Sequence, residues 1–346
     1  MADNDRPLAN DLLYSVIGLA LVFLAQTHID IGRYSFSLNR TLITVGVGLG
    51  GYGVGNLLGS LKRYVGEQRR SKSMDRLFSF TPKIVGRSIT NLPAFIATDV
   101  EGCITPPHRA EVNLRKFQRL RTYCEFVRSD AGRRYPPLVI YTGRSQGYVE
   151  LLAQSLGMIN ETMDLPFVIE NGSALYFPYK KWTKPLISHD QTALIHGIRT
   201  KLMQALPENE FEPKAYMITI NVAAKQTIDD LLQEVILKLQ GWGDIHAVTV
   251  NSTASAVDIT AKGIDKWSGL KHSIKCDPKS IVALADSTSD LCVIREVGCA
   301  YCSVYDSHPE VVQFIKTRFG DDHIIQKPHI DFVVAAVETT CGLRLL

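Results

Sequence analysis

Residues 95–105 read FIATDVEGCIT, an apolar run followed by two acidic residues that stand two positions apart. The apolar run predicts a buried strand, and side chains two positions apart in a strand point the same way. Asp99 and Glu101 would therefore lie close together. Two neighbouring carboxylates repel each other, and the pKa of one of them rises unless a cation or a reaction uses both. The end of this strand is the first indication of a functional site.

Strands and helices alternate from residue 91 onward. Candidate strands include PAFIATDV, PLVIYT, PFVIEN and IVALAD, and helices are expected around 109–129, 146–156, 265–274, 288–296 and 308–318. Apolar strands with helices between them predict an α/β fold, a three-layer Rossmann-like parallel sheet that is covered on both faces. Within 178–262 the pattern changes to helix, strand, helix, strand, strand, which predicts a small inserted α+β domain.

Ligands of open parallel sheets bind at the carboxyl ends of the strands. Four segments at such ends carry polar residues: Asp99-Val-Glu101-Gly102, Thr142-Gly143-Arg144, Lys266 in GIDKWSGL, and Asp286-Ser-Thr-Ser-Asp290. Taken singly, each of these features has a simpler structural explanation. A Thr-Gly pair such as Thr142-Gly143 is more often a turn, a lysine such as Lys266 is more often a solvated helix residue, and Asp290 could be a helix cap. Together they provide carboxylates, a hydroxyl and a lysine, which suit a phosphate group and a hard metal ion.

The segments DVEGCIT, TGR, GIDK and ADSTSD resemble, in order and rough spacing, the four motifs of haloacid dehalogenase superfamily phosphatases. IENGSALYFP, with the insert that follows it, resembles the branch that contains sucrose-phosphate and mannosylphosphoglycerate phosphatases. The resemblance covers about residues 91–340. It implies a catalytic core at 91–177 and 263–346 with an inserted cap at 178–262. Residues 76–90 would form a linker to an N-terminal segment, 1–75.

The resemblance also implies catalytic roles. Asp99 would be the nucleophile that forms an aspartyl-phosphate, and Lys266 would offset the charge of Asp99 and of the phosphoryl group. Glu101 stands where the family usually has Asp, the acid that protonates the leaving oxygen and later activates water. Mg²⁺ would be the cofactor. Its expected ligands are Asp99, Asp286, Asp290 and the backbone carbonyl of Glu101.

Thr142, Gly143, Arg144 and Asn171 are the expected substrate- and phosphate-binding residues. Arg144 could bind either the substrate or an internal carboxylate, and Asn171-Gly172 is most simply a turn that enters the insert. Two further departures from the family pattern are Ala285 in place of glycine and Ser289 in place of asparagine. The expected activity is hydrolysis of a small phosphomonoester, of the sugar or glycerate type. The alternative is a weakly active or non-catalytic subunit of a membrane complex.

The first seventy-odd residues differ in composition from the rest. Residues 12–29 and 41–61 contain no Asp, Glu, Lys or Arg. As helices they would be about 27 and about 31 Å long, near the thickness of a bilayer core. The basic segment 62–76 favours the cytoplasmic side. The sequence therefore predicts a two-helix transmembrane hairpin in the inner cell membrane with a cytoplasmic catalytic domain. Glycines at four-residue spacing (Gly51, Gly55 and Gly59) would permit self-association of the hairpin or contact with a membrane partner.

The N-terminal segment has three other interpretations. A secretory signal peptide needs a basic start, whereas the chain begins MADNDRPLAND. A buried hairpin of a soluble domain stays open, because the first apolar run is only marginally long. Gly48, Gly50 and Gly53 match a nucleotide-binding GxGxxG pattern, but no βαβ partner strand follows.

Charge and cysteine content restrict the partners. The formal net charge of +3 is too small to indicate a nucleic-acid partner. Seven cysteines, an odd number without regular spacing, indicate a reducing compartment rather than a disulfide framework. CAYC at 299–302 has the CxxC form of metal and redox sites, but without a second pair it is interpreted as part of the core.

Overall fold

The apolar segments of the sequence form a parallel sheet of five strands. This computed structural model describes residues 83–84, 91–106, 114–161, 164–253 and 255–345, all of which belong to the unit Phe80–Leu346. The strand order is β12 (Ile324–Ile325), β11 (Cys299–Ser303), β10 (Ile281–Leu284), β2 (Phe95–Thr98) and β3 (Leu138–Ile140). All neighbouring pairs run parallel, and every residue of β10 and β3 is buried. The predicted α/β architecture is confirmed.

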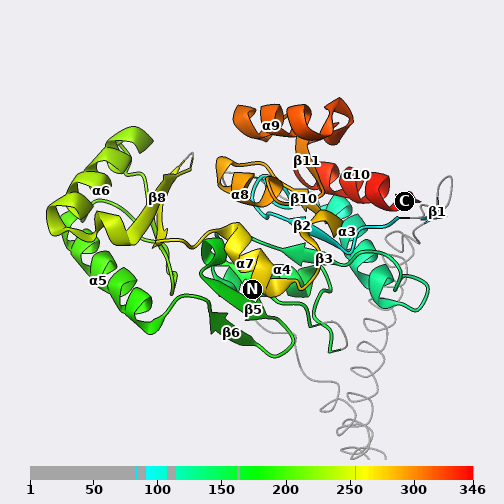
Figure 1. Ribbon diagram of the computed structural model, residues 1–346, viewed down its shortest axis with the longest axis horizontal. Coiled ribbons are helices and arrows are strands. Elements are labelled where there is room, and N and C mark those ends of the chain that lie inside the picture. Colours follow the sequence, from blue (N-terminus) through cyan, green and yellow to red (C-terminus); the bar gives the residue numbers. More distant parts are fainter. Residues whose placement is uncertain (1–82, 85–90, 107–113, 162–163, 254, 346) are drawn as a thin grey trace, which may run out of the picture. The chain divides into compact units, whose positions relative to one another are not determined.

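Helices lie on both sides of this sheet (Figure 1). They are α3 (Leu114–Arg128), α4 (Gln146–Ser155), α7 (Lys266–Ser273), α8 (Leu291–Ile294), α9 (Pro309–Phe319) and α10 (His329–Cys341). α3 packs against α10, and α9 packs against β11. The sequence did not predict α10 or β11. α10 was missed because its apolar run FVVAAV obscures a narrow polar face that contains Asp331, Glu338 and Thr339.

A second sheet, antiparallel, extends from the core. It contains β4 (Phe167–Ile169), β5 (Ala174–Phe177) and β6 (Trp182–Pro185) in that order. Tyr141, just after β3, pairs in parallel with Val168 of β4. This bridge and the backbone hydrogen bonds beside it attach the second sheet at the carboxyl end of β3.

The inserted segment folds around its own hydrophobic cluster. Its elements are α5 (His189–Ala205), β7 (Ile218–Asn221), α6 (Ile228–Trp242), β8 (Val248–Ser252) and β9 (Ala256–Ala261). From α5 onward the predicted order of helix, strand, helix, strand, strand is confirmed, but the predicted range 178–262 also contains β6, which belongs to the second sheet. The strands form an antiparallel sheet in the order β7-β9-β8. Capping boxes at Ser188 and Thr227 satisfy backbone amides at the starts of the two helices. We call this segment the cap.

The predicted membrane hairpin, 12–29 and 41–61, lies outside the described residues. Among the described residues, no helix is both long enough and apolar enough to cross a bilayer.

Gly172, between β4 and β5, allows α7 to approach the core. Its φ of +93° is disfavoured for any residue with a side chain. A Cβ atom at this position would lie 1.9 Å from the backbone oxygen of Asp265, the residue that precedes Lys266. The position of Lys266 therefore depends on the absence of a side chain here.

We expect Gly172→Ala to destabilise the protein by about 1–3 kcal/mol or more, because it forces a strained φ and a backbone clash together. The matched control is Gly197→Ala in α5, where no atom lies within 4 Å of the added Cβ. This control should stabilise the helix by about 0.5–1 kcal/mol. Denaturant unfolding of both variants measures the difference. A Gly172→Ala variant as stable as the parent would show that α7 does not depend on this contact.

Candidate active site

Four segments meet at the carboxyl edge of the parallel sheet. Asp99 follows β2, Asp286 follows β10, and Thr142 follows β3. These three strands are neighbours in the sheet, so the residues after them converge. Lys266 is the first residue of α7 and reaches the same place. The structure thus brings together polar residues that are up to 191 positions apart in the sequence, from Asp99 to Asp290.

Lys266 lies between two carboxylates in the interior. Its Nζ atom is 2.7 Å from Asp99 Oδ2 and 2.7 Å from Asp290 Oδ1. The three side chains are only 4%, 7% and 0% exposed. Burying such ions costs free energy that only close pairing and hydrogen bonding offset. One ammonium group faces the carboxylates of Asp99, Asp286 and Asp290, so this buried cluster has an excess of negative charge.

The pKa values reflect that excess. Burial raises the pKa of Asp99, Lys266 lowers it and Asp290 raises it again, with a result of about 7. Burial, together with Asp290 and Asp99, raises the pKa of Asp286 well above its ordinary range. Burial disfavours the ammonium form of Lys266, but the carboxylates of Asp290 and Asp99 outweigh it and raise its pKa. Without a further cation, the raised pKa values of Asp99 and Asp286 favour their protonated forms, while Lys266 stays charged.

The donor set fits a divalent cation. Among the described residues, Asp99, Asp286 and Asp290 form the group whose ligand atoms all lie within 4.8 Å of one another. Oxygen donors of this kind suit Mg²⁺, and a bound cation would relieve the repulsion that raises the carboxylate pKa values. Gly102, at φ +69°, makes this approach feasible, because a Cβ atom there would lie 2.1 Å from Asp286 Oδ2. The carboxyl group of Glu101 is outside this group, and the role of its backbone carbonyl stays a prediction.

Asp290 also organises the loop that carries Asp286. Its Oδ2 atom accepts hydrogen bonds from the backbone amides of Asp286 and Ser287, each at 3.1 Å. Its Oδ1 atom accepts from Lys266. The Ser287 hydroxyl is 2.8 Å from the hydroxyl of Ser289, the position where the family usually has asparagine. A serine at 289 therefore takes part in this loop, and the Asp290 carboxylate connects the loop to the lysine.

Thr142, Gly143 and Asn171 form a second side of the site. Thr142 is 2% exposed, and its hydroxyl accepts the backbone amide of Arg144 at 3.2 Å. Asn171 donates its backbone amide to the Thr142 carbonyl at 3.0 Å. A Cβ atom on Gly143 would lie 2.9 Å from the side-chain oxygen of Asn171. Asn171 has φ +54°, so the predicted turn is present and directs this side chain toward Gly143.

Glu101 and Arg144 form an ion pair at the edge of the site. Arg144 Nη1 also lies 3.6 Å from Glu212 Oε1, a residue of the cap. The sequence left open whether Arg144 meets an internal carboxylate, and in the structure it meets two. The Glu101 side chain is 44% exposed, unlike the buried carboxylates of Asp99 and Asp290.

Sequence reasoning missed the cap residues that face the core. Asn171 Nδ2 donates to Asp258 Oδ2 at 3.0 Å, and Asp258 also accepts from Thr219 at 2.5 Å. Lys214, almost fully buried, donates to Thr219 and pairs with Glu212. One signal existed for Asp258: it is a charged residue inside AVDITA, a strand that is otherwise apolar or uncharged and is buried throughout. Glu212 and Lys214 lie in an irregular segment that gives no such signal.

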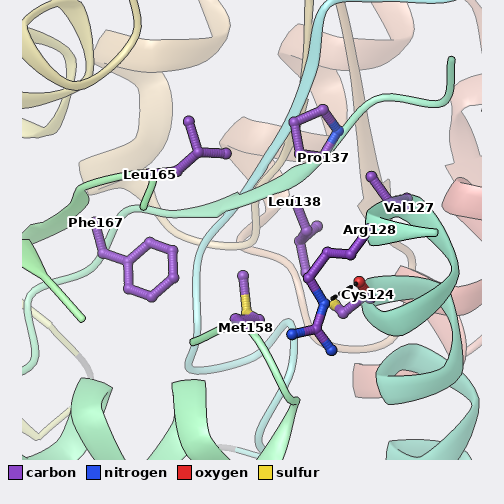
Figure 2. A pocket seen from close by; sticks show the side chains of 8 residues that line it. All are labelled: Cys124, Val127, Arg128, Pro137, Leu138, Met158, Leu165 and Phe167. Atoms are coloured by element: carbon purple, nitrogen blue, oxygen red, sulfur yellow. Dashed lines mark hydrogen bonds between the residues drawn. The ribbon is translucent and has the colours of Figure 1, made fainter. Parts of the chain in front are cut away.

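A separate pocket lies away from these residues. Figure 2 shows its lining, which includes Leu138, Phe167 and Arg128. Leu138 and Phe167 begin β3 and β4, so the pocket lies at the amino ends of strands whose carboxyl ends carry the polar residues. Its volume of about 30 Å³ is roughly that of one water molecule. It is therefore not part of the candidate active site.

The raised pKa of Asp99 predicts a pH-dependent effect of Mg²⁺ on stability. The pKa is 3.8 in the absence of its surroundings and about 7 in the folded protein. The folded state therefore binds more protons, and this contribution to stability is fully present below about pH 4 and is lost as the pH rises through about 7. Saturating Mg²⁺ should replace those protons and raise the melting temperature more at pH 8 than at pH 5.

Asp286→Asn should reduce that increment, whereas Asp130→Asn, in an exposed ion pair, should keep it. Thermal unfolding in the presence of Mg²⁺ or of a chelator measures this increase in melting temperature for each variant. Equal increments at both pH values would argue against a cation site made of these acids.

Comparison with known proteins identifies the fold. No model of a protein family and no curated protein matches the chain. A haloacid dehalogenase-like hydrolase from Bacteroides thetaiotaomicron shares 16% identity at a TM-score of 0.52, over 71% of this chain and 99% of that one. A protein from Thermoplasma acidophilum shares 13% sequence identity at a TM-score of 0.52, over 72% of this chain and 99% of that one. A protein from Thermotoga maritima shares 13% sequence identity at a TM-score of 0.51, over 72% of this chain and 97% of that one.

The resemblance to sucrose-phosphate and mannosylphosphoglycerate phosphatases stays a prediction. At these identities the structural matches show the fold, and the strand order agrees with it. The chain has the α/β fold of haloacid dehalogenase-like hydrolases, a parallel sheet with an inserted antiparallel cap.

Proposed function

We propose that the chain is a Mg²⁺-dependent phosphomonoester hydrolase that acts through an aspartyl-phosphate at Asp99. The buried contact of Lys266 with Asp99 and Asp290, with Asp286 beside them, is the observation that carries this proposal. Phosphoryl transfer requires a placed nucleophile and positive charge around the transferred group. A buried lysine in an acidic cluster that fits a divalent cation meets both requirements.

In the first step, a carboxylate oxygen of Asp99 attacks phosphorus and the bond to the ester oxygen breaks. Glu101 donates a proton to that oxygen, and the product leaves as an alcohol. Lys266 holds Asp99 in place and remains charged beside the transferring group. Thr142, Gly143 and Asn171 provide hydroxyl, amide and side-chain donors for the phosphate oxygens.

In the second step, water attacks phosphorus and the bond to Asp99 breaks. Glu101, now a carboxylate, takes the proton from that water, so phosphate is released and both acids return to their first state. Asp99, Asp286 and Asp290, with the Glu101 backbone carbonyl, would hold Mg²⁺, whose charge stabilises the negative phosphoryl oxygens. Splitting one displacement into two in this way is the advantage of a covalent intermediate.

The proposed substrate is a small phosphorylated metabolite of the sugar or glycerate type. Its support is the polar side of the cap, where Glu212, Lys214 and Asp258 lie near the two core loops that contain Arg144 and Asn171. Hydroxyl and carboxylate groups are what such side chains recognise. A phosphate-release screen of the full chain against a panel of phosphomonoesters with Mg²⁺ tests this proposal, and release from none of them would contradict it.

The second candidate is a weakly active or non-catalytic subunit of a membrane complex. The unusual residues Glu101, Ala285 and Ser289 motivate it. Against it stands the retained cluster, because a buried lysine among several acids is costly when nothing uses it. Ser289 also fits its loop through the hydroxyl of Ser287.

We further propose that residues 12–29 and 41–61 anchor the chain in a membrane, with the catalytic domain and both ends on the cytoplasmic side. The apolar lengths and the basic segment 62–76 support this. The full chain should sediment with membranes and require detergent for extraction. Replacing 1–75 with a soluble tag should release it. A full chain that stays in the soluble fraction would refute the anchor.

Asp99→Asn should abolish turnover of every phosphomonoester, because a neutral amide is not a competent nucleophile. Asp130→Asn, an exposed position that takes the same change, should retain the parental rate. Steady-state phosphate release measures both variants. Near-parental turnover by Asp99→Asn would overturn the assigned nucleophile.

A further inference from the structure

Arg144 lies between a carboxylate of the core and a carboxylate of the cap. Its Nη2 atom binds Glu101, and its Nη1 atom is 3.6 Å from Glu212 Oε1. The ring of Tyr148 lies 5.4 Å from the guanidinium carbon, within the range of a cation–π contact. Burial disfavours the charge, but Glu101 and Glu212 outweigh it and raise the pKa of Arg144. The guanidinium therefore stays charged and has partners on both sides.

The backbone of Arg144 is held as firmly as its side chain. Its amide donates to the Thr142 hydroxyl at 3.2 Å, and its carbonyl accepts the amide of Glu170 at 3.1 Å. The two loops that surround the candidate phosphate site are thus joined at this residue. A guanidinium with planar donors on a fixed backbone can hold a carboxylate in one orientation.

Glu101 needs such a partner. Its side chain has one more rotatable bond than the Asp usually found here and is 44% exposed, so burial does not fix its rotamer. Each freely rotating bond that must be ordered costs conformational entropy. The ion pair with Arg144 provides that order at the edge of the site.

Glu212 is itself fixed within the cap. Its Oε2 atom is 3.1 Å from the buried Lys214 Nζ, which donates to Thr219 at 2.6 Å. Thr219 donates to Asp258, and Asp258 accepts from Asn171 of the core. The cap therefore contacts both ends of the candidate phosphate site, once through Arg144 and once through Asn171.

We propose that Arg144 is a positioning residue that holds the carboxyl group of Glu101 for proton transfer, and that Glu212 of the cap fixes Arg144 for this task. The proposal rests on the proposed function and adds a specific coupling to it: the acid is in place when the cap is in contact with the core. Arg144 is then not primarily a substrate-binding residue. Substrate binding, the competing role, would use the Nε atom of Arg144, which is buried and lacks a hydrogen-bond partner within the part of the chain that is described.

The test compares two substrates that differ in their need for an acid. An alkyl phosphate such as glycerol phosphate needs protonation of its leaving oxygen, whereas 4-nitrophenyl phosphate does not. Arg144→Gln should lower kcat for the alkyl ester by up to about 100-fold, the effect of a misplaced catalytic group. It should change kcat for the aryl ester, and KM for both esters, much less. Glu212→Gln should act in the same direction and less strongly.

A double-mutant cycle isolates the coupling. If Arg144 acts through Glu101, Arg144→Gln should cause no further loss of alkyl turnover in a Glu101→Gln background. The control is Arg133→Gln, which removes an arginine from an exposed pair with Asp130 and should leave both rates unchanged. Melting temperatures of all variants monitor folding. If Arg144→Gln does not fold, the effect of Glu212→Gln on the turnover of the two esters decides whether the positioning role holds.

Each outcome has a distinct meaning. Equal losses for the two esters with a raised KM would assign Arg144 to substrate binding and overturn the positioning role, while the proposed function stands. Additive losses in the double variant would overturn it as well. If the parent hydrolyses neither ester nor any other phosphomonoester, the proposed function is wrong and the positioning role falls with it.

Discussion

One buried ammonium group between two carboxylates determines how the site is built. Lys266 contacts Asp99 and Asp290 at 2.7 Å, and these residues come from the start of α7, the end of β2 and the turn between β10 and α8. Each partner is fixed by the fold: adjacent parallel strands place the two acids, and Gly172 lets the helix approach closely enough for the lysine to reach them. Because ions lose their hydration when they are buried, this arrangement is stable only when the charges meet in this geometry. Three acids surround a single lysine, and this excess of acidic groups explains why a divalent cation fits beside the lysine.

A chain of polar side chains continues from this cluster toward the cap. The core loop that follows β3 presents Arg144 on one side and faces Asn171 on the other, and both contact cap residues. The cap has its own hydrophobic cluster, so its sheet and helices are stabilised separately from the core. Tyr216 of the cap packs against the hydrophobic cluster of the core, but the contacts beside the candidate site are polar. Polar contacts can be exchanged for water or substrate with a small change in free energy. A cap held in this way is suited to admit a substrate and then to exclude water from the reacting groups.

Parts of this arrangement were predictable from the sequence, because they follow from local rules. Asp99 and Asp286 were predictable because buried strands end just before them and the carboxyl ends of parallel strands converge. Lys266 was predicted through the family resemblance, since it follows β9 of the antiparallel cap sheet rather than a strand of the parallel sheet. The ion pair of Arg144 with Glu212 was not, because it depends on how the cap approaches the core, which no local pattern encodes. The helix α10 was missed for a different reason: its long apolar run obscures the narrow polar face that Asp331, Glu338 and Thr339 form. The branch of sugar-phosphate phosphatases stays a prediction, since specificity depends on side-chain positions rather than on fold.

The central claim is that Asp99 accepts the phosphoryl group. The most direct measurement is rapid acid quenching of the full chain during turnover of an aryl phosphate with Mg²⁺, followed by peptide mass mapping. The account predicts an acid-stable, base-labile phosphoryl group on the peptide that contains Asp99, formed at least as fast as phosphate is released. Turnover without any phosphorylated peptide, or with the phosphoryl group on a different residue, would contradict it.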